Sequence, residues 1–341
     1  MSKILITGGC GYIGSHTIVD LIENGFEVIS IDNLSNSSEF TMHGVEKITG
    51  KKVINHNIDL CDFEKLNLFF ENNQDIKGII HFAALKSVGD SVSNPIGYFE
   101  NNLYSLLNLL KCMNLHQINN FIFSSSCSVY GNADELPVTE STPFKEAESP
   151  YARTKQMGEQ ILQDFVRSHH QVKSIALRYF NPAGAHHSIE IGESSRNIAN
   201  NLVPVITETA IGKRTTMTVF GKDYHTRDGS CIRDYIHVSD IAHAHTLAID
   251  HLLNQQNAPN FDVFNLGNGE GVTVLEAIKA FENESNVKLN YQLGERRDGD
   301  VVAIYANNHK AEKILNWMPK YSINDIMKTA WLWEKKRSNK D

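Results

Sequence analysis

Tyr151 and Lys155 stand four residues apart in the segment Ser149–Lys155, which reads SPYARTK. Ser149 is a favourable N-cap and Pro150 suits a first helical position, so we expect a helix to begin here. Helical spacing then puts the phenol of Tyr151 and the ammonium of Lys155 on one face. A free phenol titrates at about pH 10, and a neighbouring cation favours the phenolate, which lowers the pKa towards working pH. The pair is therefore a candidate acid/base for a sugar or alcohol hydroxyl, although two ordinary surface residues can have the same spacing.

A glycine-rich turn near the N-terminus is a candidate phosphate-binding motif. The apolar run Ile4–Ile6 predicts a short buried strand, and a helical pattern follows the turn. Between them, Gly9, Gly11 and Gly14 match G-x-G-x-x-G, while Gly8, Gly11 and Gly14 match the variant with a glycine at every third position. Such a turn lets backbone N–H groups and a helix N-terminus approach a pyrophosphate.

Asp32 completes this unit from the end of the next predicted strand. Gly25 ends the helix, and the segment Phe26–Ile31 has the composition of a second strand. A carboxylate at that strand end hydrogen-bonds the adenosine ribose 2′-OH and repels a 2′-phosphate. Asp32 alone is equally well a solvated loop carboxylate. The aligned strand, turn, helix and second strand nevertheless predict a dinucleotide site that takes NAD rather than NADP.

Strand and helix patterns continue to alternate along the first half of the chain. Apolar segments around 53–60, 79–84, 121–126 and 174–180 predict strands, and a long helix is expected after Pro95. This alternation is typical of the α/β class, with a doubly wound parallel sheet and helices on both faces. Ligands bind such sheets beyond the carboxyl ends of the strands. Ser126 falls at that edge, where it is expected to hydrogen-bond the hydroxyl on which Tyr151 acts.

The pattern changes after residue 180, where glycine and asparagine become frequent and the predicted elements shorten. We expect residues 1–180 to form a Rossmann-type dinucleotide-binding domain and residues 181–341 to form a smaller, mixed α/β lobe over the ligand edge. A strand and helix pattern around 233–268 is expected to pack back onto the first domain. Arg233, Arg296 and Arg297 lie next to turn residues and suit a phosphate or pyrophosphate group, although each can equally be a surface ion-pair arginine.

Composition excludes several classes of function. The 341 residues carry a formal net charge of -8 with a pI of about 6.0, which disfavours a nucleic-acid surface. The five cysteines are scattered without a Cys-x-x-Cys pair, which favours free thiols over disulfides or a zinc site. No apolar run reaches membrane-spanning length, and no signal-peptide pattern begins the chain. We therefore expect a soluble cytoplasmic protein.

Taken together, these motifs resemble the extended short-chain dehydrogenase/reductase family and, within it, the UDP-glucose 4-epimerases. The resemblance follows the chain in order over nearly its whole length. It is carried by the segments TGGCGYIGSH at 7–16, DNL at 32–34, HFAALK at 81–86, NN at 101–102, FIFSSS at 121–126, YARTK at 151–155, RYFNP at 178–182, NNL at 200–202, RDYIHV at 233–238 and RRDGD at 296–300.

The resemblance implies an enzyme without a metal that retains NAD and interconverts UDP-galactose and UDP-glucose. Tyr151 would take the proton from the sugar 4-OH while hydride leaves C4, and the 4-keto sugar would turn over in the pocket before both return. Lys155 would hold the nicotinamide ribose and stabilise the Tyr151 phenolate, and Ser126 would hydrogen-bond the substrate. Members of this family are usually homodimers, here through helices near 98–113 and 151–168.

The resemblance also implies two sets of binding residues. The NAD-binding set comprises Gly8, Gly11, Tyr12, Ile13, Gly14, Asp32, Asn33, Asp59, Leu60, Phe82, Ala83, Ala84, Lys86, Asn101, Tyr151, Lys155 and Phe180. The substrate-binding set comprises Ser126, Tyr151, Asn181, Asn201, Leu202, Phe220, Arg233, Arg297, Asp300 and Ile304. Phe220 would face the uracil, and the arginines would face the pyrophosphate.

Two details bear on the substrate. Related 4,6-dehydratases and UDP-glucuronate decarboxylases place a carboxylate just after the active-site Ser or Thr, whereas Ser126 is followed by Cys127. This favours epimerisation. Many bacterial galactose-type enzymes carry a bulky Tyr where this chain has Ile304, a smaller but stiff β-branched residue. Epimerisation of UDP-GalNAc and UDP-GlcNAc, or of UDP-glucuronate, is therefore the alternative.

Two other classes share the fold. A non-enzymatic NAD-binding sensor usually lacks the Tyr or the Lys, and this chain has both. A plain NAD-dependent alcohol dehydrogenase would produce NADH and would need added NAD.

Overall fold

The computed structural model describes residues 1–194, 199–255, 257–297 and 301–338. Its main feature is a seven-stranded parallel sheet with the order β11-β6-β5-β4-β1-β2-β3. The strands are β1 (Lys3–Thr7), β2 (Glu27–Ile31), β3 (Asn55–His56), β4 (Ile76–His81), β5 (Asn120–Ser126), β6 (Lys173–Tyr179) and β11 (Phe261–Leu266). The chain leaves β1 towards one edge of the sheet and returns from β3 to β4 on the other side. The carboxyl ends of β1 and β4 therefore flank the switch point, where such sheets bind ligands.

Helices cover both faces of this sheet, as the alternating pattern predicts. One buried apolar cluster joins the sheet to α1 (Tyr12–Glu23), α2 (Phe40–Thr49) and α8 (Val238–Asn254). A second cluster on the opposite face joins it to α3 (Phe63–Glu71), α5 (Pro95–His116) and α6 (Pro150–Ser168). The doubly wound α/β fold is thus confirmed.

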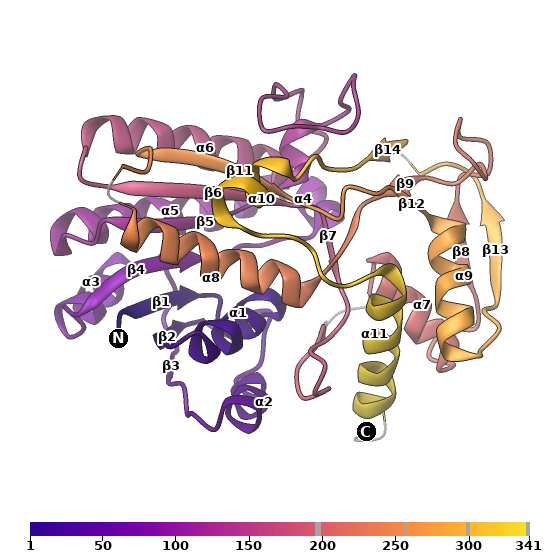
Figure 1. The fold of residues 1–341 in the computed structure, drawn as a ribbon, viewed down its shortest axis with the longest axis horizontal. Coiled ribbons are helices and arrows are strands. Elements are labelled where there is room, and N and C mark those ends of the chain that lie inside the picture. The colour runs from indigo at the N-terminus through magenta and orange to yellow at the C-terminus, as the bar shows by residue number, and fades with distance from the viewer. Residues whose placement is uncertain (195–198, 256, 298–300, 339–341) are drawn as a thin grey trace.

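Residues beyond 180 divide between the sheet and a smaller lobe (Figure 1). β11 pairs with β6 in register from Phe261↔Ser174 to Leu266↔Tyr179, and α8 packs on the sheet. The lobe contains short strands and helices around its own apolar cluster. Its elements are β7 (Asn181–Ala183), α7 (Leu202–Ala210), β8 (Met217–Phe220), β9 (Ile232–Arg233), β10 (Tyr235–His237), β12 (Val272–Thr273), α9 (Val274–Ser285), β13 (Tyr291–Gly294), β14 (Ala303–Ile304) and α11 (Ile323–Ser338), whereas α10 (His309–Leu315) packs with the sheet and α8. The domain boundary at 180 stays a prediction.

One predicted strand is displaced. The apolar run 79–84 was expected to be extended throughout, but β4 spans Ile76–His81. Phe82 still donates its backbone N–H to the carbonyl of Thr7 at 3.0 Å, after which the chain leaves the sheet. The glycine turn lies against this point, since a Cβ at Gly8 would come within 2.8 Å of the backbone N of Ala83. The glycine turn thus occupies the space into which β4 would otherwise extend.

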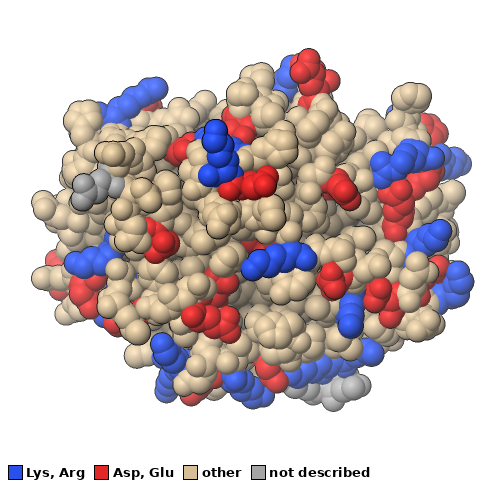
Figure 2. Space-filling view, in the orientation of Figure 1, with Lys and Arg blue, Asp and Glu red and all other residues tan. Residues whose placement is uncertain are grey.

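Two short helices complete the part of the chain that reaches the sheet edge. They are α4 (Val88–Ser93) and the 3-10 helix η1 (Cys127–Tyr130), which follow β4 and β5 respectively. On the face drawn in Figure 2, acidic and basic side chains are interspersed rather than gathered into one patch of a single sign.

Candidate active site

The helix that carries Tyr151 and Lys155 begins as the sequence predicts. Ser149 is the N-cap of α6, and its Oγ accepts a hydrogen bond from the backbone N of Ala152 at 3.2 Å. Pro150 is the first helical residue. The first turns of α6 pack against the end of β5, so that Tyr151 and Lys155 face that strand.

Ser126, Tyr151 and Lys155 are brought together where β5 meets α6. The Ser126 hydroxyl lies near enough to the Tyr151 phenol to lower its pKa. The Nζ of Lys155 donates to the carbonyl oxygen of Ser124 at 2.7 Å and lies 5.8 Å from the centroid of the Tyr151 ring. It also lies 5.0 Å from the ring centroid of Phe123, whose electron-rich face favours a cation.

The expected lowering of the Tyr151 pKa is wrong for this structure. Burial raises the pKa of Tyr151 well above its usual value, the nearby Tyr179 raises it further, and the hydrogen bond from Ser126 only partly opposes this. Burial also lowers the pKa of Lys155 to about 8, against the charge of Glu159. The sequence argument counted the cation beside the phenol. It could not count the desolvation of both groups, which is the larger effect here.

The glycine turn is shaped for close approach of a ligand to the backbone. A Cβ at Gly14 would lie 2.2 Å from the carbonyl oxygen of Gly8, and one at Gly11 would lie 3.1 Å from the same atom. Gly8 itself has a φ of +73°. Gly11 is the N-cap of α1 and provides no side-chain cap. The first backbone N–H groups of α1 therefore point towards the turn, as a pyrophosphate requires.

Asp32 is held in place for a ribose. One carboxylate oxygen accepts from the backbone N of Cys10 at 3.0 Å, and the other accepts from the backbone N of Leu34 at 2.9 Å and from the Ser37 hydroxyl at 2.7 Å. The carboxylate thus faces the glycine turn across the ends of β1 and β2. These residues fit NAD. The glycine turn has no room for a Cβ, and beside it the Asp32 carboxylate is a fixed acceptor for a ribose 2′-OH.

The remaining predicted NAD-binding residues lie along the same edge. Asn33 donates to the carboxylate of Asp59 at 3.4 Å, which joins the ends of β2 and β3. Asn101 on α5 donates to Asn102 at 2.9 Å. Tyr12 donates from its hydroxyl to the carbonyl of Gly184 at 2.6 Å. The other members of the set are Ile13 on α1, Leu60 after β3, Phe82, Ala83, Ala84 and Lys86 after β4, and Phe180 after β6.

Glu193 connects a predicted NAD residue to a predicted substrate residue. Its carboxylate oxygen Oε1 lies 3.6 Å from the Nζ of Lys86 and accepts from the side-chain N of Asn201 at 3.2 Å. Asn201 is the N-cap of α7, and Leu202 is the first residue of that helix. Sequence reasoning missed Glu193, because it lies in an irregular segment that has no periodic pattern.

Phe220 and Arg297 are in contact. The Arg297 guanidinium lies 5.5 Å from the centroid of the Phe220 ring, which is 43% exposed at the end of β8. An exposed aromatic ring beside an arginine can stack on a base and pair with a phosphate. Asp300 lies outside the described residues.

Arg233 and Ile304, two further residues of the predicted substrate set, lie opposite each other on paired strands. Arg233 donates to the carbonyl of Val301 at 2.5 Å, and β9 pairs with β14 so that Arg233 is opposite Ile304. Burial raises the pKa of the Cys127 thiol to about 12, whereas the charge of Arg233 lowers it. Arg233 is therefore near Cys127, the residue that follows Ser126.

Two members of the predicted substrate set are held by the fold, one through its side chain and one through its backbone. Ile304 is 6% exposed and packs in an apolar cluster with Phe180 and Val129. Asn181 bonds through its backbone N to the carbonyl of Asp234 at 2.9 Å.

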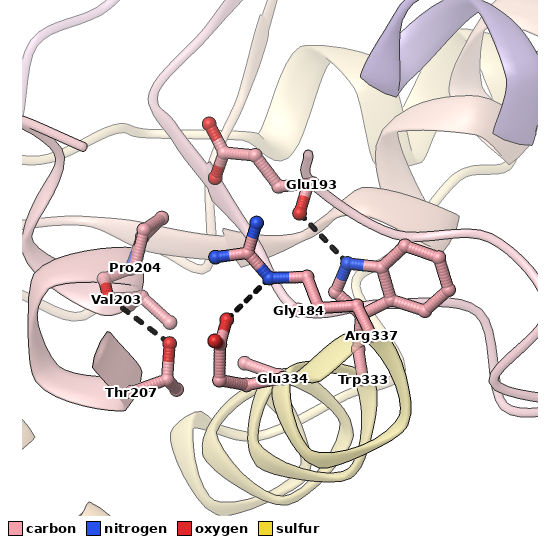
Figure 3. Close-up of a pocket in the computed structure, with 9 residues that line it drawn as sticks. Gly184, Glu193, Val203, Pro204, Thr207, Trp333, Glu334 and Arg337 are labelled. Carbon is pink, nitrogen blue, oxygen red and sulfur yellow. Dashed lines mark hydrogen bonds and ion pairs between the residues drawn. The ribbon is translucent and has the colours of Figure 1, made fainter. Parts of the chain in front are cut away.

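A small cavity elsewhere is too small to be the substrate site (Figure 3). Its volume is about 20 Å³, which is room for roughly one water molecule. It lies between α7 and α11, where Trp333 donates to the carbonyl of Glu193 at 2.7 Å and Arg337 donates to Glu334 at 2.6 Å. The contact of Trp333 beside this cavity shows how α11 holds the segment that carries Glu193. Among the described residues, no group of three or more His, Cys, Asp or Glu side chains is placed to hold a metal ion.

The comparisons with known proteins show the family of this chain. The family model described as GDP-mannose 4,6 dehydratase matches residues 5–330. A UDP-glucose 4-epimerase from Erwinia amylovora is 44% identical over 339 residues, which are 99% of this chain and 99% of that protein. The solved UDP-glucose 4-epimerase of Bifidobacterium longum, in complex with NAD+ and UDP, has a TM-score of 0.94 and 43% identity, covering 99% of both chains. That of Stenotrophomonas maltophila, with bound NAD and formylated UDP-arabinopyranose, has a TM-score of 0.96 and 38% identity, covering 100% of both.

Proposed function

Because the chain belongs to the UDP-glucose 4-epimerase family, within the extended short-chain dehydrogenase/reductases, we propose that it interconverts UDP-galactose and UDP-glucose. The cofactor is NAD, and the reaction is a reversible hydride transfer at sugar C4 through a 4-keto sugar. The observation that carries this proposal is the meeting of Ser126, Tyr151 and Lys155 at the sheet edge that also holds the glycine turn and Asp32.

NAD, when bound, supplies a positively charged nicotinamide ring that accepts a hydride and gives it back. The turn at Gly8, Gly11 and Gly14 with the N-terminus of α1 would hold its pyrophosphate, and Asp32 would hold the adenosine ribose. Lys155 would hold the nicotinamide ribose. Its ammonium is already fixed by the Ser124 carbonyl at 2.7 Å, so little side-chain freedom remains to be lost on binding.

Tyr151 would exchange the proton of the sugar 4-OH. The phenolate form of Tyr151 would remove that proton as hydride leaves C4, and the resulting phenol would return it to O4 when hydride comes back to the opposite face of C4. Ser126 lies close to the Tyr151 phenol and would hydrogen-bond the reacting oxygen. Because burial favours the neutral phenol, Tyr151 is a strong proton acceptor once it is ionised.

The nucleotide must be held firmly while the sugar turns, since the keto sugar must not escape. Phe220 would stack on the uracil, and Arg297 and Arg233 would pair with the pyrophosphate. Asn181, Asn201, Leu202 and Asp300 complete the proposed set. Phe220, Asn201 and Leu202 belong to the lobe, so this part of the grip on the nucleotide comes from other elements than the Tyr151 chemistry on α6.

UDP-glucose and UDP-galactose are the proposed substrates, and N-acetylated UDP-hexoses are the alternative that Ile304 makes testable. The side chain of Ile304 is packed against Phe180 in an apolar cluster, which favours a fixed wall over a movable one. A UDP-glucuronate carboxylate would need a dedicated cation, and the proposed set assigns none to that place.

We also propose a homodimer through the helices near 98–113 and 151–168. One side of α5 exposes apolar side chains to solvent, within a stripe about 100° wide. These are Ile96, Tyr104, Leu107 and Leu115, each at least 37% exposed. A second copy of the chain would cover them. Size-exclusion chromatography with light scattering should give a dimer for the wild type and a monomer for Leu107→Asp, and a monomeric wild type would refute the proposal.

Among the described residues, no helix combines the length and the apolar character needed to cross a bilayer. A cytoplasmic location stays a prediction.

The test of the activity uses purified protein and UDP-galactose with no added cofactor, with the products separated by chromatography. Conversion to UDP-glucose without net NADH supports the proposal. Parallel reactions with UDP-GalNAc and UDP-glucuronate decide between the substrate alternatives. Net NADH would instead indicate a dehydrogenase, and bound NAD without turnover of any sugar would indicate a sensor.

A further inference from the structure

Three residues of α6 share one face: Tyr151, Lys155 and Glu159. Each step of four residues advances only about 40° around a helix, so the three side chains form a row. The row lies against the three serines that end β5, Ser124–Ser126. Lys155 donates to the carbonyl of the first serine at 2.7 Å, Glu159 accepts from the hydroxyl of the second at 2.5 Å, and the Tyr151 phenol lies near the hydroxyl of the third.

Glu159 has no exposed surface and a complete set of partners. Besides Ser125, its carboxylate accepts from the Nε of Arg178 at 2.9 Å and from the Nη2 of the same residue at 2.6 Å. Arg178 is itself only 4% exposed and donates to the hydroxyl of Tyr130 at 3.0 Å. A buried ion pair of this kind seldom adds stability over an apolar pair of similar size, because both charges must be desolvated. Packing alone therefore does not account for a carboxylate at this position.

We propose that Glu159 is a positioning residue of the active site, which fixes the end of β5 against α6 and keeps the ammonium of Lys155 charged. This inference rests on the proposed function, in which Lys155 must be a cation. Glu159 acts on the active site through two other residues. Its carboxylate contacts Ser125, and its charge acts on Lys155.

The surroundings of Lys155 explain why a nearby anion is needed. Its neighbours are the carbonyl of Ser124 and the Phe123 ring on β5, Tyr151 on its own helix and His81 on β4. Burial lowers the pKa of Lys155 to about 8, and the charge of Glu159 is what opposes it. Burial and the charge of Lys155 in turn lower the pKa of His81 to about 3, so His81 is neutral and adds no second positive charge beside Lys155.

The contact with Ser125 fixes the neighbouring serine as well. Ser125 and Ser126 are adjacent at the end of β5, so a hydrogen bond that holds Ser125 to α6 also restrains the backbone that carries Ser126. Ser126 is the residue that meets the Tyr151 phenol. Loss of the Glu159 carboxylate is therefore expected to affect Ser126 and Tyr151 as well as Lys155.

The experiment compares the pH profile of kcat in the wild type and in Glu159→Gln, which keeps the shape of the side chain and removes its charge. Without that charge the pKa of Lys155 falls further, so the alkaline limb should move by about one unit or more to lower pH, with little change in KM. The matched control is Asp164→Asn, which removes an exposed carboxylate from the same helix and should leave the profile unmoved.

A second variant separates charge from folding. In Glu159→Gln the guanidinium of Arg178 is left buried and unpaired, which both destabilises the fold and repels Lys155. The double variant Glu159→Gln/Arg178→Met removes that charge too, so it should fold better and shift the alkaline limb less than the single variant. A limb that does not move in the single variant, or that moves at least as far in the double variant, would overturn the inference.

The inference and the proposed function can fail separately. Absence of sugar turnover by the wild type would refute the activity. The titration of Lys155 would still be measurable by nitrogen NMR of protein labelled at the lysine side chains, in the NAD-loaded state. A lower midpoint in Glu159→Gln supports the inference, and an unchanged midpoint overturns it, whatever the sugar chemistry.

Discussion

Replacing Gly14 by alanine is expected to abolish tight NAD binding, because the added methyl carbon has no room. A Cβ at this position would lie 2.2 Å from the carbonyl oxygen of Gly8 and 2.9 Å from the Cα of Gly9. Real Cβ atoms essentially never come within 3.0 Å of another heavy atom, so the turn must shift by about 1 Å. Both neighbours are backbone atoms, so no side-chain rotation can relieve the contact.

The size of the effect follows from where that shift falls. Overpacking of this kind costs about 1–3 kcal/mol of stability. A displacement of about 1 Å in a positioning element costs on the order of a hundredfold in function. We therefore expect NAD to bind Gly14→Ala about a hundredfold or more weakly than the wild type, with a lower melting temperature.

The matched control is Gly89→Ala in α4. A Cβ at Gly89 would meet nothing within 4 Å, and its backbone is not in the left-handed region. The same change there should stabilise the protein by about 0.5–1 kcal/mol and leave NAD binding unchanged. The assay is the NAD content per chain of the purified protein, followed by calorimetric titration of NAD. Wild-type affinity in Gly14→Ala, or equal losses in the two variants, would refute the reasoning.

Four further outcomes are expected. Tyr151→Phe should lower kcat by about 10²–10⁴-fold with NAD still bound, and a smaller loss in the chromatographic assay would remove Tyr151 from the proton transfer. Phe220→Ala should raise the KM for UDP-galactose about tenfold at nearly constant kcat, since stacking acts on ground state and transition state alike; an unchanged KM would exclude the uracil contact. Asp32→Ala should reduce the preference for NAD over NADP in titrations, and an unchanged preference would contradict the ribose role. Burial lowers the pKa of His245 to about 4, so the folded state disfavours its protonation and stability falls as pH drops from about 6.5. The wild type should thus lose about 2 kcal/mol more than His245→Phe in urea unfolding between pH 7 and pH 5, whereas equal losses would exclude the effect.

The elements that the sequence predicts best are those whose signals are local. The cap at Ser149, the glycine turn and the strand before Asp32 each follow from a few adjacent residues, and each lies where expected. β4 begins before the apolar run, since its first residues include Gly78 and the exposed Lys77. The apolar run continues beyond His81 into the loop. What ends the strand is the glycine turn, more than sixty residues away in sequence, and such a contact has no local signal.

The site residues divide in the same way. Tyr151 and Lys155 could be paired from their spacing, and Glu159 continues that spacing by one more step, so it was open to the same argument. The partners of Glu159, by contrast, come from β5 and β6 and depend on strand pairing. Glu193 had no signal of its own, because its two partners, Lys86 and Asn201, belong to segments that only the folded chain brings together.

The largest departure concerns the proton of Tyr151, and it follows from burial. A cation beside a phenol lowers its pKa in water, but here the ammonium and the phenol are both removed from water. Desolvation raises the pKa of Tyr151 and lowers that of Lys155 to about 8, so both shifts favour the neutral forms, although Lys155 still keeps its proton near neutral pH. Near neutral pH the chain alone therefore keeps the proton on the phenol, and only added positive charge at the site can release it. The pair is best understood as a proton acceptor that is restrained until the cofactor is in place, and this makes the charge state of Lys155, and hence Glu159, a control point of the reaction.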